Sequence, residues 1–89
     1  IYTHDSTQYY VSGGKNSFQF GDVTIGDNTV IGTMSMIGYG VKIGRHCVIA
    51  AHSFVNADVQ DYSIVAGNPA KVIGHVEILE DGEVKFIYL

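Results

Sequence analysis

The chain is long enough for one small domain and has too few cations for a nucleic-acid surface. It has 89 residues and a formal net charge of −4, with only 5 Lys and Arg side chains. Nucleic-acid binding depends on clustered Lys and Arg that neutralise phosphates, so we expect no such partner. The single cysteine excludes a disulfide framework. No segment reaches the ~18 apolar residues of a membrane helix and no secretory signal opens the chain, which predicts a cytoplasmic protein without a membrane partner.

The amino-terminal residues predict a strand that leads into a loop. Residues 1–3 read as a short strand of a preceding coil, and because the chain begins at Ile1 without Met we expect a piece of a longer protein. Residues 4–22 are polar with a flexible centre, which predicts an excursion loop. His4 lies at this junction, where a neutral imidazole can accept a proton from a hydroxyl. The alternative is a loop histidine that only contacts solvent.

Six consecutive hexads fill residues 25–60 without an insertion. The first place is always aliphatic, the fifth is always small or β-branched, and the second is Gly in the first four hexads. A six-residue period is typical of a parallel β-helix, in which three short strands make one coil and the coils stack in register. We expect the first-place side chains to fill the interior and the second-place glycines to make the turns. The repeat therefore predicts an all-β fold with β-helix coils over residues 23–66.

Three side chains inside the repeat belong to types that often carry chemistry. His46 and His52 hold the same place in successive hexads, so they are expected on adjacent sides of the prism as ordinary outward-facing residues. The alternative is a zinc site completed across a trimer interface, because three imidazoles form a catalytic zinc set. Cys47 occupies a small fifth place, where packing explains it without reactivity.

The repeat ends at Asp61, which stands in a place that requires an aliphatic residue. Residues 67–75 follow as a closing turn, because Asn68-Pro69 after a glycine is a strong turn signal. A helix is not expected anywhere in the chain except as a short turn after Pro69. Lys71 is a cation beyond the repeat that could hold a phosphate, and a solvated lysine is the alternative.

Residues 76–89 predict a carboxy-terminal hairpin. Apolar and polar residues alternate around Asp81-Gly82, a dipeptide typical of two-residue hairpin turns. We expect this hairpin to cap the stack of coils or to pair with a neighbouring chain.

The segment from Val23 to Gly74 resembles the carboxy-terminal half of the hexapeptide-repeat acyltransferases. This family includes galactoside, maltose and other sugar O-acetyltransferases and the chloramphenicol-type xenobiotic acetyltransferases. The hexads carry the likeness in fold, and the ending DYSIVAGNPAKVIG at residues 61–74 is the more specific marker. The resemblance implies a left-handed parallel β-helix, against the usual right-handed crossover preference, and a homotrimer with active sites in clefts between subunits.

The resemblance also implies a reaction and a set of site residues. It implies an acetyl-CoA-dependent O-acetyltransferase that acts on a hydroxyl of a sugar or a similar small acceptor. His4 matches the histidine before the excursion loop, which deprotonates the acceptor hydroxyl. Thr33 and Ala51 match positions whose backbone grips the pantetheine arm, and Lys71 matches the basic residue near the nucleotide end. No metal is expected, because the thioester is already activated and positioning with one base is enough.

Two departures from the family leave alternatives open. Relatives commonly have Thr-Lys-Asp where this chain has Asn56-Ala57-Asp58, which weakens the expected hold on the CoA phosphates. The family's amino-terminal coils, which help to shape the acceptor pocket, are also absent from this sequence. One alternative is therefore a truncated, catalytically weak or inactive trimeric β-helix. Another is a zinc-dependent protein of the carbonic anhydrase type, which needs three convergent histidines that this spacing supports poorly.

Overall fold

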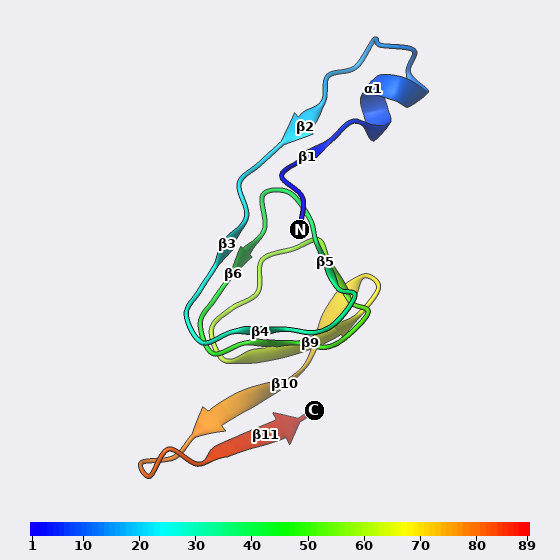
Figure 1. Ribbon diagram of the computed structural model, residues 1–89. Coiled ribbons are helices and arrows are strands. Elements are labelled where there is room, and N and C mark those ends of the chain that lie inside the picture. The colour runs from blue at the N-terminus through cyan, green and yellow to red at the C-terminus, as the bar shows by residue number, and fades with distance from the viewer.

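The computed structural model describes residues 1–89 and consists of short strands with one helix of five residues (Figure 1). The molecule is elongated, with principal extents of 56 × 20 × 19 Å. The elements are β1 His4–Asp5, α1 Thr7–Val11, β2 Gln19–Phe20, β3 Thr24–Ile25, β4 Val30–Ile31, β5 Met36–Ile37, β6 Lys42–Ile43, β7 Val48–Ile49, β8 Phe54–Val55, β9 Ser63–Gly67, β10 Ala70–Ile78 and β11 Val84–Tyr88.

Parallel strand pairs form the three sides of a triangular coil (Figure 1). Strand β3 pairs with β6, β4 with β7, and β5 with β8, all in parallel. Ile31 lies beside Ile49, and Ile49 lies beside Val65 of β9 on the next level. The parallel stacking predicted from the six-residue period is therefore confirmed over the repeat.

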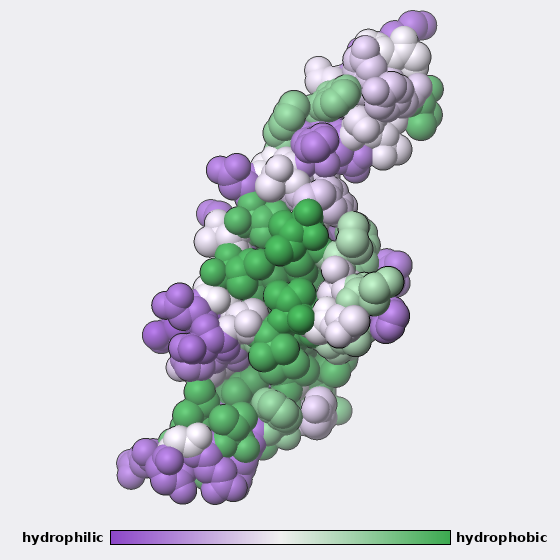
Figure 2. Space-filling model, in the orientation of Figure 1, coloured by the Kyte–Doolittle hydropathy of each residue, from purple (hydrophilic) through white to green (hydrophobic).

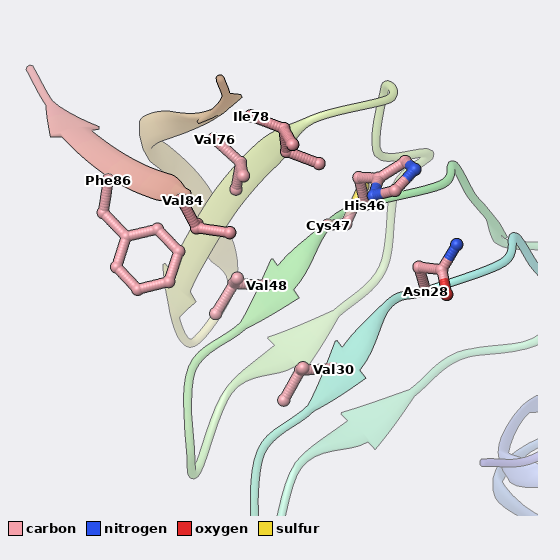
Figure 3. A pocket seen from close by; sticks show the side chains of 9 residues that line it. All are labelled: Asn28, Val30, His46, Cys47, Val48, Val76, Ile78, Val84 and Phe86. Carbon is pink, nitrogen blue, oxygen red and sulfur yellow. The ribbon is translucent and has the colours of Figure 1, made fainter. Parts of the chain in front are cut away.

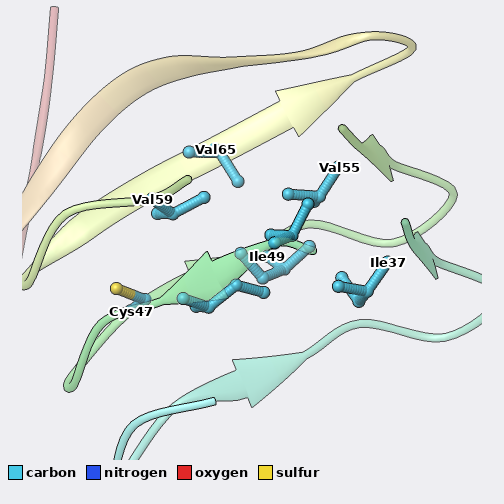
Figure 4. Packing of buried hydrophobic residues seen from close by; sticks show 8 residues of the cluster. Ile37, Cys47, Ile49, Val55, Val59 and Val65 are labelled. Atoms are coloured by element: carbon cyan, nitrogen blue, oxygen red, sulfur yellow. The ribbon is translucent and has the colours of Figure 1, made fainter. Parts of the chain in front are cut away.

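The interior of the coils is filled by the first and fifth places of the hexads, as predicted. The buried side chains from these two places are Ile37, Val41, Ile43, Cys47, Ile49, Ser53, Val55 and Val59. Figure 4 labels Ile37, Cys47, Ile49, Val55 and Val59 of this set. The thiol of Cys47 lies 3.1 Å from the carbonyl oxygen of Gln60, to which it donates a weak hydrogen bond. Every side chain in this core is small or aliphatic, which allows successive coils to approach closely.

The second-place glycines do not make the turns, and that expectation is wrong. The left-handed backbone conformation occurs at the fourth place instead, in Asn28, Met34, Gly40, His46 and His52. The second-place glycines are needed for another reason. A Cβ on Gly32 would lie 2.5 Å from the amide nitrogen of Ala51, in the coil below. A side chain at Gly26, Gly32 or Gly44 would therefore collide with backbone, whereas Gly38 has more room.

The amino-terminal segment differs in detail from the prediction. Residues 1–3 are not a strand, although the amide of Tyr2 donates a 3.0 Å hydrogen bond to the carbonyl of Ile37. The first strand is β1, which pairs antiparallel with β2 at the base of the excursion. The excursion contains α1, which corrects the expectation that no helix forms there. The carboxylate of Asp5 accepts the amide hydrogen of Thr7 at 2.8 Å and so satisfies a donor in the first turn.

The chain after the coils extends one side of the prism as a sheet. Strands β9, β10 and β11 join β7 and β4 in the order β11-β10-β9-β7-β4. No helical turn follows Pro69, because residues from Ala70 onward pair with β9. The hairpin of β10 and β11 has a connection longer than the two residues predicted, since the last pair is Ile78 with Val84.

Candidate functional site

His4 lies on an exposed aromatic face at the base of the excursion. It stands directly opposite Phe20 in the β1–β2 pair, so both side chains are on the same face. The imidazole is stacked near-parallel to Phe18, with centroids 6.4 Å apart and an interplanar angle of 11°. The Phe20 ring is 6.2 Å from the imidazole. His4 is therefore exposed but held in a defined place by flanking rings.

The residue after His4 lines a polar hollow at the start of the coils. This hollow has a volume of about 350 Å³ and is lined by Tyr2, Asp5, Gly38, Tyr39, Phe54 and Asn56. Hydrogen bonds from the side chain and then the backbone of Thr7, together with the charge of His4, lower the pKa of Asp5 below its ordinary value. The lowered pKa keeps Asp5 a carboxylate at neutral pH, at the edge of the hollow and next to His4 in the chain.

Thr33 and Ala51 lie at one corner of the prism, on successive coils. Thr33 follows β4 and Ala51 follows β7, and the carbonyl of Thr33 accepts the amide hydrogen of His52 at 3.0 Å. Both residues are exposed, and neither backbone amide donates a hydrogen bond within the chain. This corner therefore has two backbone N–H groups without a partner in the chain, on successive coils.

Lys71 lies on the same side of the prism as this corner. Lys71 is the second residue of β10 and pairs with Ala66 of β9. The residue before Ala66, Val65, lies beside Ile49 of β7, which leads into the corner of Ala51. Its side chain is exposed and takes part in no ion pair. The structure thus brings three of the predicted site residues, Thr33, Ala51 and Lys71, to one side of the coils.

His4 is not part of that side. The segment that carries it leaves the prism beside Ile37, and the returning segment passes Gly40, so the excursion emerges at the corner between β5 and β6. In Figure 1 this excursion projects away from the coils. One chain therefore places the imidazole and the Thr33–Ala51 corner at two different corners of the triangle.

The two histidines of the repeat also lie apart from each other. His46 stacks on Tyr62 with centroids 4.9 Å apart and an interplanar angle of 9°, and the Arg45 guanidinium lies 5.7 Å from the same ring. His52 is exposed at the corner of Thr33. Within one chain no three His, Cys, Asp or Glu side chains gather as a metal-binding group.

A second hollow lies between the coils and the hairpin. It has a volume of about 210 Å³, and apolar side chains of β4, β7, β10 and β11 line most of it (Figure 3). Figure 2 shows that apolar side chains form a continuous area over the coils, while the lower extremity of the molecule is mostly hydrophilic and the upper one is mixed. The only ionisable residues that line this hollow are His46 and the buried Cys47.

The aromatic cluster of the excursion was missed in the sequence. Its members are Tyr9, Tyr10, Phe18 and Phe20, whose rings contact one another and His4. The signal that could have found it is four aromatic residues in a loop that is otherwise polar. His4 and Phe20 lie sixteen positions apart in the chain and come together because β1 and β2 pair.

Comparison with known proteins gives matches in sequence and in structure. Residues 22–57 match the family model described as bacterial transferase hexapeptide (six repeats). A chloramphenicol acetyltransferase from Klebsiella aerogenes is 44% identical over 63 residues, which are 70% of this chain and 30% of that protein. A maltose O-acetyltransferase from Clostridium difficile 630 has a TM-score of 0.73 at 36% identity, covering 86% of this chain and 41% of the other.

A third match carries a bound donor. A hexapeptide-repeat-containing acetyltransferase from Vibrio cholerae, solved with acetyl coenzyme A, has a TM-score of 0.74 at 32% identity, covering 83% of this chain and 40% of the other. The chain spans less than half the length of each of these three proteins. The structure has no helix that is both long and apolar enough to cross a bilayer. The hexads, their parallel coils and these matches together show that the chain contains the hexapeptide repeat of bacterial transferases and is similar in sequence and structure to hexapeptide-repeat acetyltransferases.

Proposed function

We propose that this chain forms the carboxy-terminal coils of an acetyl-CoA-dependent O-acetyltransferase with a small hydroxylated acceptor, such as a sugar. The observation that carries the proposal is the corner where the free amides of Thr33 and Ala51 stand one above the other, with Lys71 on the same side. A pantetheine arm has amide carbonyls that can accept from these donors, and its nucleotide end has phosphates that a lysine attracts. The similarity to a structure that holds acetyl coenzyme A supports this assignment.

The proposed chemistry uses one base. The unprotonated imidazole of His4 takes the proton of the acceptor hydroxyl as the oxygen attacks the thioester carbonyl carbon. The new C–O bond forms, the C–S bond breaks, and the CoA thiolate leaves and is protonated. The thioester supplies the activation, so the protein has to position the two reactants and remove one proton.

We further propose that the assembly is a homotrimer of left-handed coils in the cytoplasm. His4 and the Thr33–Ala51 corner are at different corners of one chain, so a site that uses both requires a second copy. A closed ring of three chains places the same pair of surfaces together at every interface. The left-handed sense of the coils follows the family resemblance.

The proposal is tested by thiol release from acetyl-CoA in the presence of maltose or chloramphenicol. His4→Ala should lower kcat by about 100-fold or more, since a positioned general base contributes about that much. His75→Ala is the matched control, because His75 is exposed on β10 and its imidazole interacts only with the carboxylate of Glu77. If turnover is the same in His4→Ala and in the parent chain, His4 is not the base.

A catalytically weak or inactive trimer is the second candidate. The replacement of the family's Thr-Lys-Asp by Asn56-Ala57-Asp58 favours it, because one cation near the CoA phosphates is lost. Calorimetric titration with CoA separates the two candidates. An acetyltransferase must bind CoA, whereas a chain that only retains the coils gives no binding heat.

A further inference from the structure

The excursion presents an aromatic surface that has no role in the proton transfer and CoA binding proposed above. Phe20 is 73% exposed and Tyr10 is 70% exposed, although both lie in a short loop with polar neighbours. Exposed aromatic rings that gather beside a candidate catalytic group mark a binding surface. They also lie on a defined backbone, because the β1–β2 pair fixes their register.

The rings are arranged as a supported platform. Phe18 and Phe20 lie 6.2 Å apart and nearly parallel, with an interplanar angle of 22°. Tyr9 contacts Phe18 edge-on at 4.9 Å and in turn contacts Tyr10 at 5.1 Å. The inner ring is therefore held from behind, and the outer ring of Phe20 keeps an open face.

The two faces of the excursion differ in chemistry. His4 and Phe20 share one face because they lie opposite each other in the β1–β2 pair. The Phe18 ring lies near both, with its centroid 6.4 Å from the imidazole and 6.2 Å from the Phe20 ring. At the next position of the β1–β2 pair, Asp5 lies opposite Gln19. The side-chain amide of Gln19 donates a 3.1 Å hydrogen bond to the side-chain oxygen of Gln8. One face is thus aromatic with a single imidazole, and the other is made of carboxylate and amide groups.

We infer that Phe20, supported by Phe18, is a specificity-determining residue that stacks on a flat apolar face of the acceptor and so presents the acceptor's hydroxyl to His4. This inference rests on the proposed acyl transfer and adds the substrate class to it. The acceptor is a small hydroxylated molecule with a flat apolar face, which the C–H face of a pyranose or an aryl ring provides. A molecule without such a face has nothing to place against the open ring.

The first test compares Phe20→Ala, Phe20→Tyr and Val11→Ala in steady-state assays. We use maltose as the pyranoside arm and chloramphenicol as the aryl arm. Phe20→Ala should raise KM for the acceptor that stacks by about threefold to tenfold, with KM for acetyl-CoA unchanged. Phe20→Tyr should keep the parent KM, because it retains the ring. Val11→Ala is the matched control, an exposed apolar residue of the same loop with no aromatic partner.

Other roles for Phe20 give different results. If Phe20→Ala lowers kcat and moves its pH profile while the acceptor KM stays constant, Phe20 only orients His4 and the inference is wrong. If the native mass of the assembly changes in Phe20→Ala, the ring belongs to a subunit interface and the inference is also wrong.

The second test does not need turnover. Resonances of the Phe20 ring should shift on titration with the stacking acceptor in His4→Ala as in the parent chain, and Phe20→Ala should bind the acceptor about threefold to tenfold more weakly. Shifts without turnover in the parent chain would remove the proposed function and retain the stacking site. Turnover without any shift of the Phe20 ring resonances would retain the proposed function and remove the stacking site.

Discussion

The hydroxyl of Thr29 connects two coils by accepting the amide hydrogen of Cys47 at 3.1 Å, eighteen residues further along the chain. The same hydroxyl donates to the carbonyl of Gly44 at 2.8 Å. Ser35 repeats this arrangement on the next side, where it donates to the carbonyl of Ala50 at 2.8 Å. The fifth place of the hexad therefore satisfies backbone groups that the corners leave without a partner.

Thr29→Val should destabilise the fold, because the amide of Cys47 would lose its acceptor next to the buried core. We expect the free energy of unfolding to fall by about 1–3 kcal/mol, measured by urea denaturation. Thr24→Val is the control, since Thr24 is exposed on β3 and its hydroxyl makes no hydrogen bond. Equal stability of the two variants would contradict a structural role for the Thr29 hydroxyl.

Two glycines at the same place of the hexad should respond differently to alanine. A Cβ on Gly32 would lie 2.5 Å from the backbone nitrogen of Ala51, whereas the nearest atoms to a Cβ on Gly38 are 3.3 Å away. Gly32→Ala should therefore lower the free energy of unfolding by about 1–3 kcal/mol or more, through displaced backbone. Gly38→Ala should cost clearly less. Thermal denaturation of the two variants measures the difference, and the opposite order would contradict the assignment of the need for glycine to backbone contact.

The carboxyl group of Asp5 should titrate below pH 3.8. Hydrogen bonds from Thr7, first from its side chain and then from its amide, and the charge of His4 lower the pKa of Asp5 from its ordinary value of 3.8. The resulting stabilisation is present above pH 3.8 and is lost as the pH falls through the lower folded-state pKa. Side-chain NMR titration should show that Thr7→Val moves the midpoint of Asp5 upward, while Thr24→Val leaves it in place. A midpoint unaffected by Thr7→Val would contradict this assignment of the cause.

Lys71→Ala should weaken CoA binding modestly and in a salt-dependent way. The side chain is exposed, so its attraction for a phosphate is screened, and we expect the Kd of CoA to rise by about twofold to fivefold at low ionic strength. Lys85→Ala is the control, because Lys85 lies on β11 opposite Glu77, near the other end of β10 from Lys71. Calorimetry at two salt concentrations measures the effect. Equal losses in the two variants would show that only net charge matters.

The sequence by itself determined the coils and their core. Each first-place aliphatic residue can be buried only if the chain turns every six residues, so the period specifies the strands and the buried set, including Ile37 and Ile49. The resemblance in the closing segment predicts Lys71 as a ligand-binding residue, and this role stays a prediction; the structure shows only that Lys71 lies on the same side of the coils as Thr33 and Ala51. The hexads repeat along the chain and the closing segment is continuous, and therefore both patterns are visible in the amino-acid sequence.

Only the tertiary structure decided the rest. The glycine at Gly32 is required by the backbone of Ala51 in the next coil, a contact that local conformational preference does not contain. The pairing of β1 with β2 brings His4 beside Phe20, and the winding of the coils puts His4 and Thr33 at different corners. The physical reason is the same in each case. These relationships depend on which distant segments touch, and that is set by how the coils stack and where the excursion leaves them.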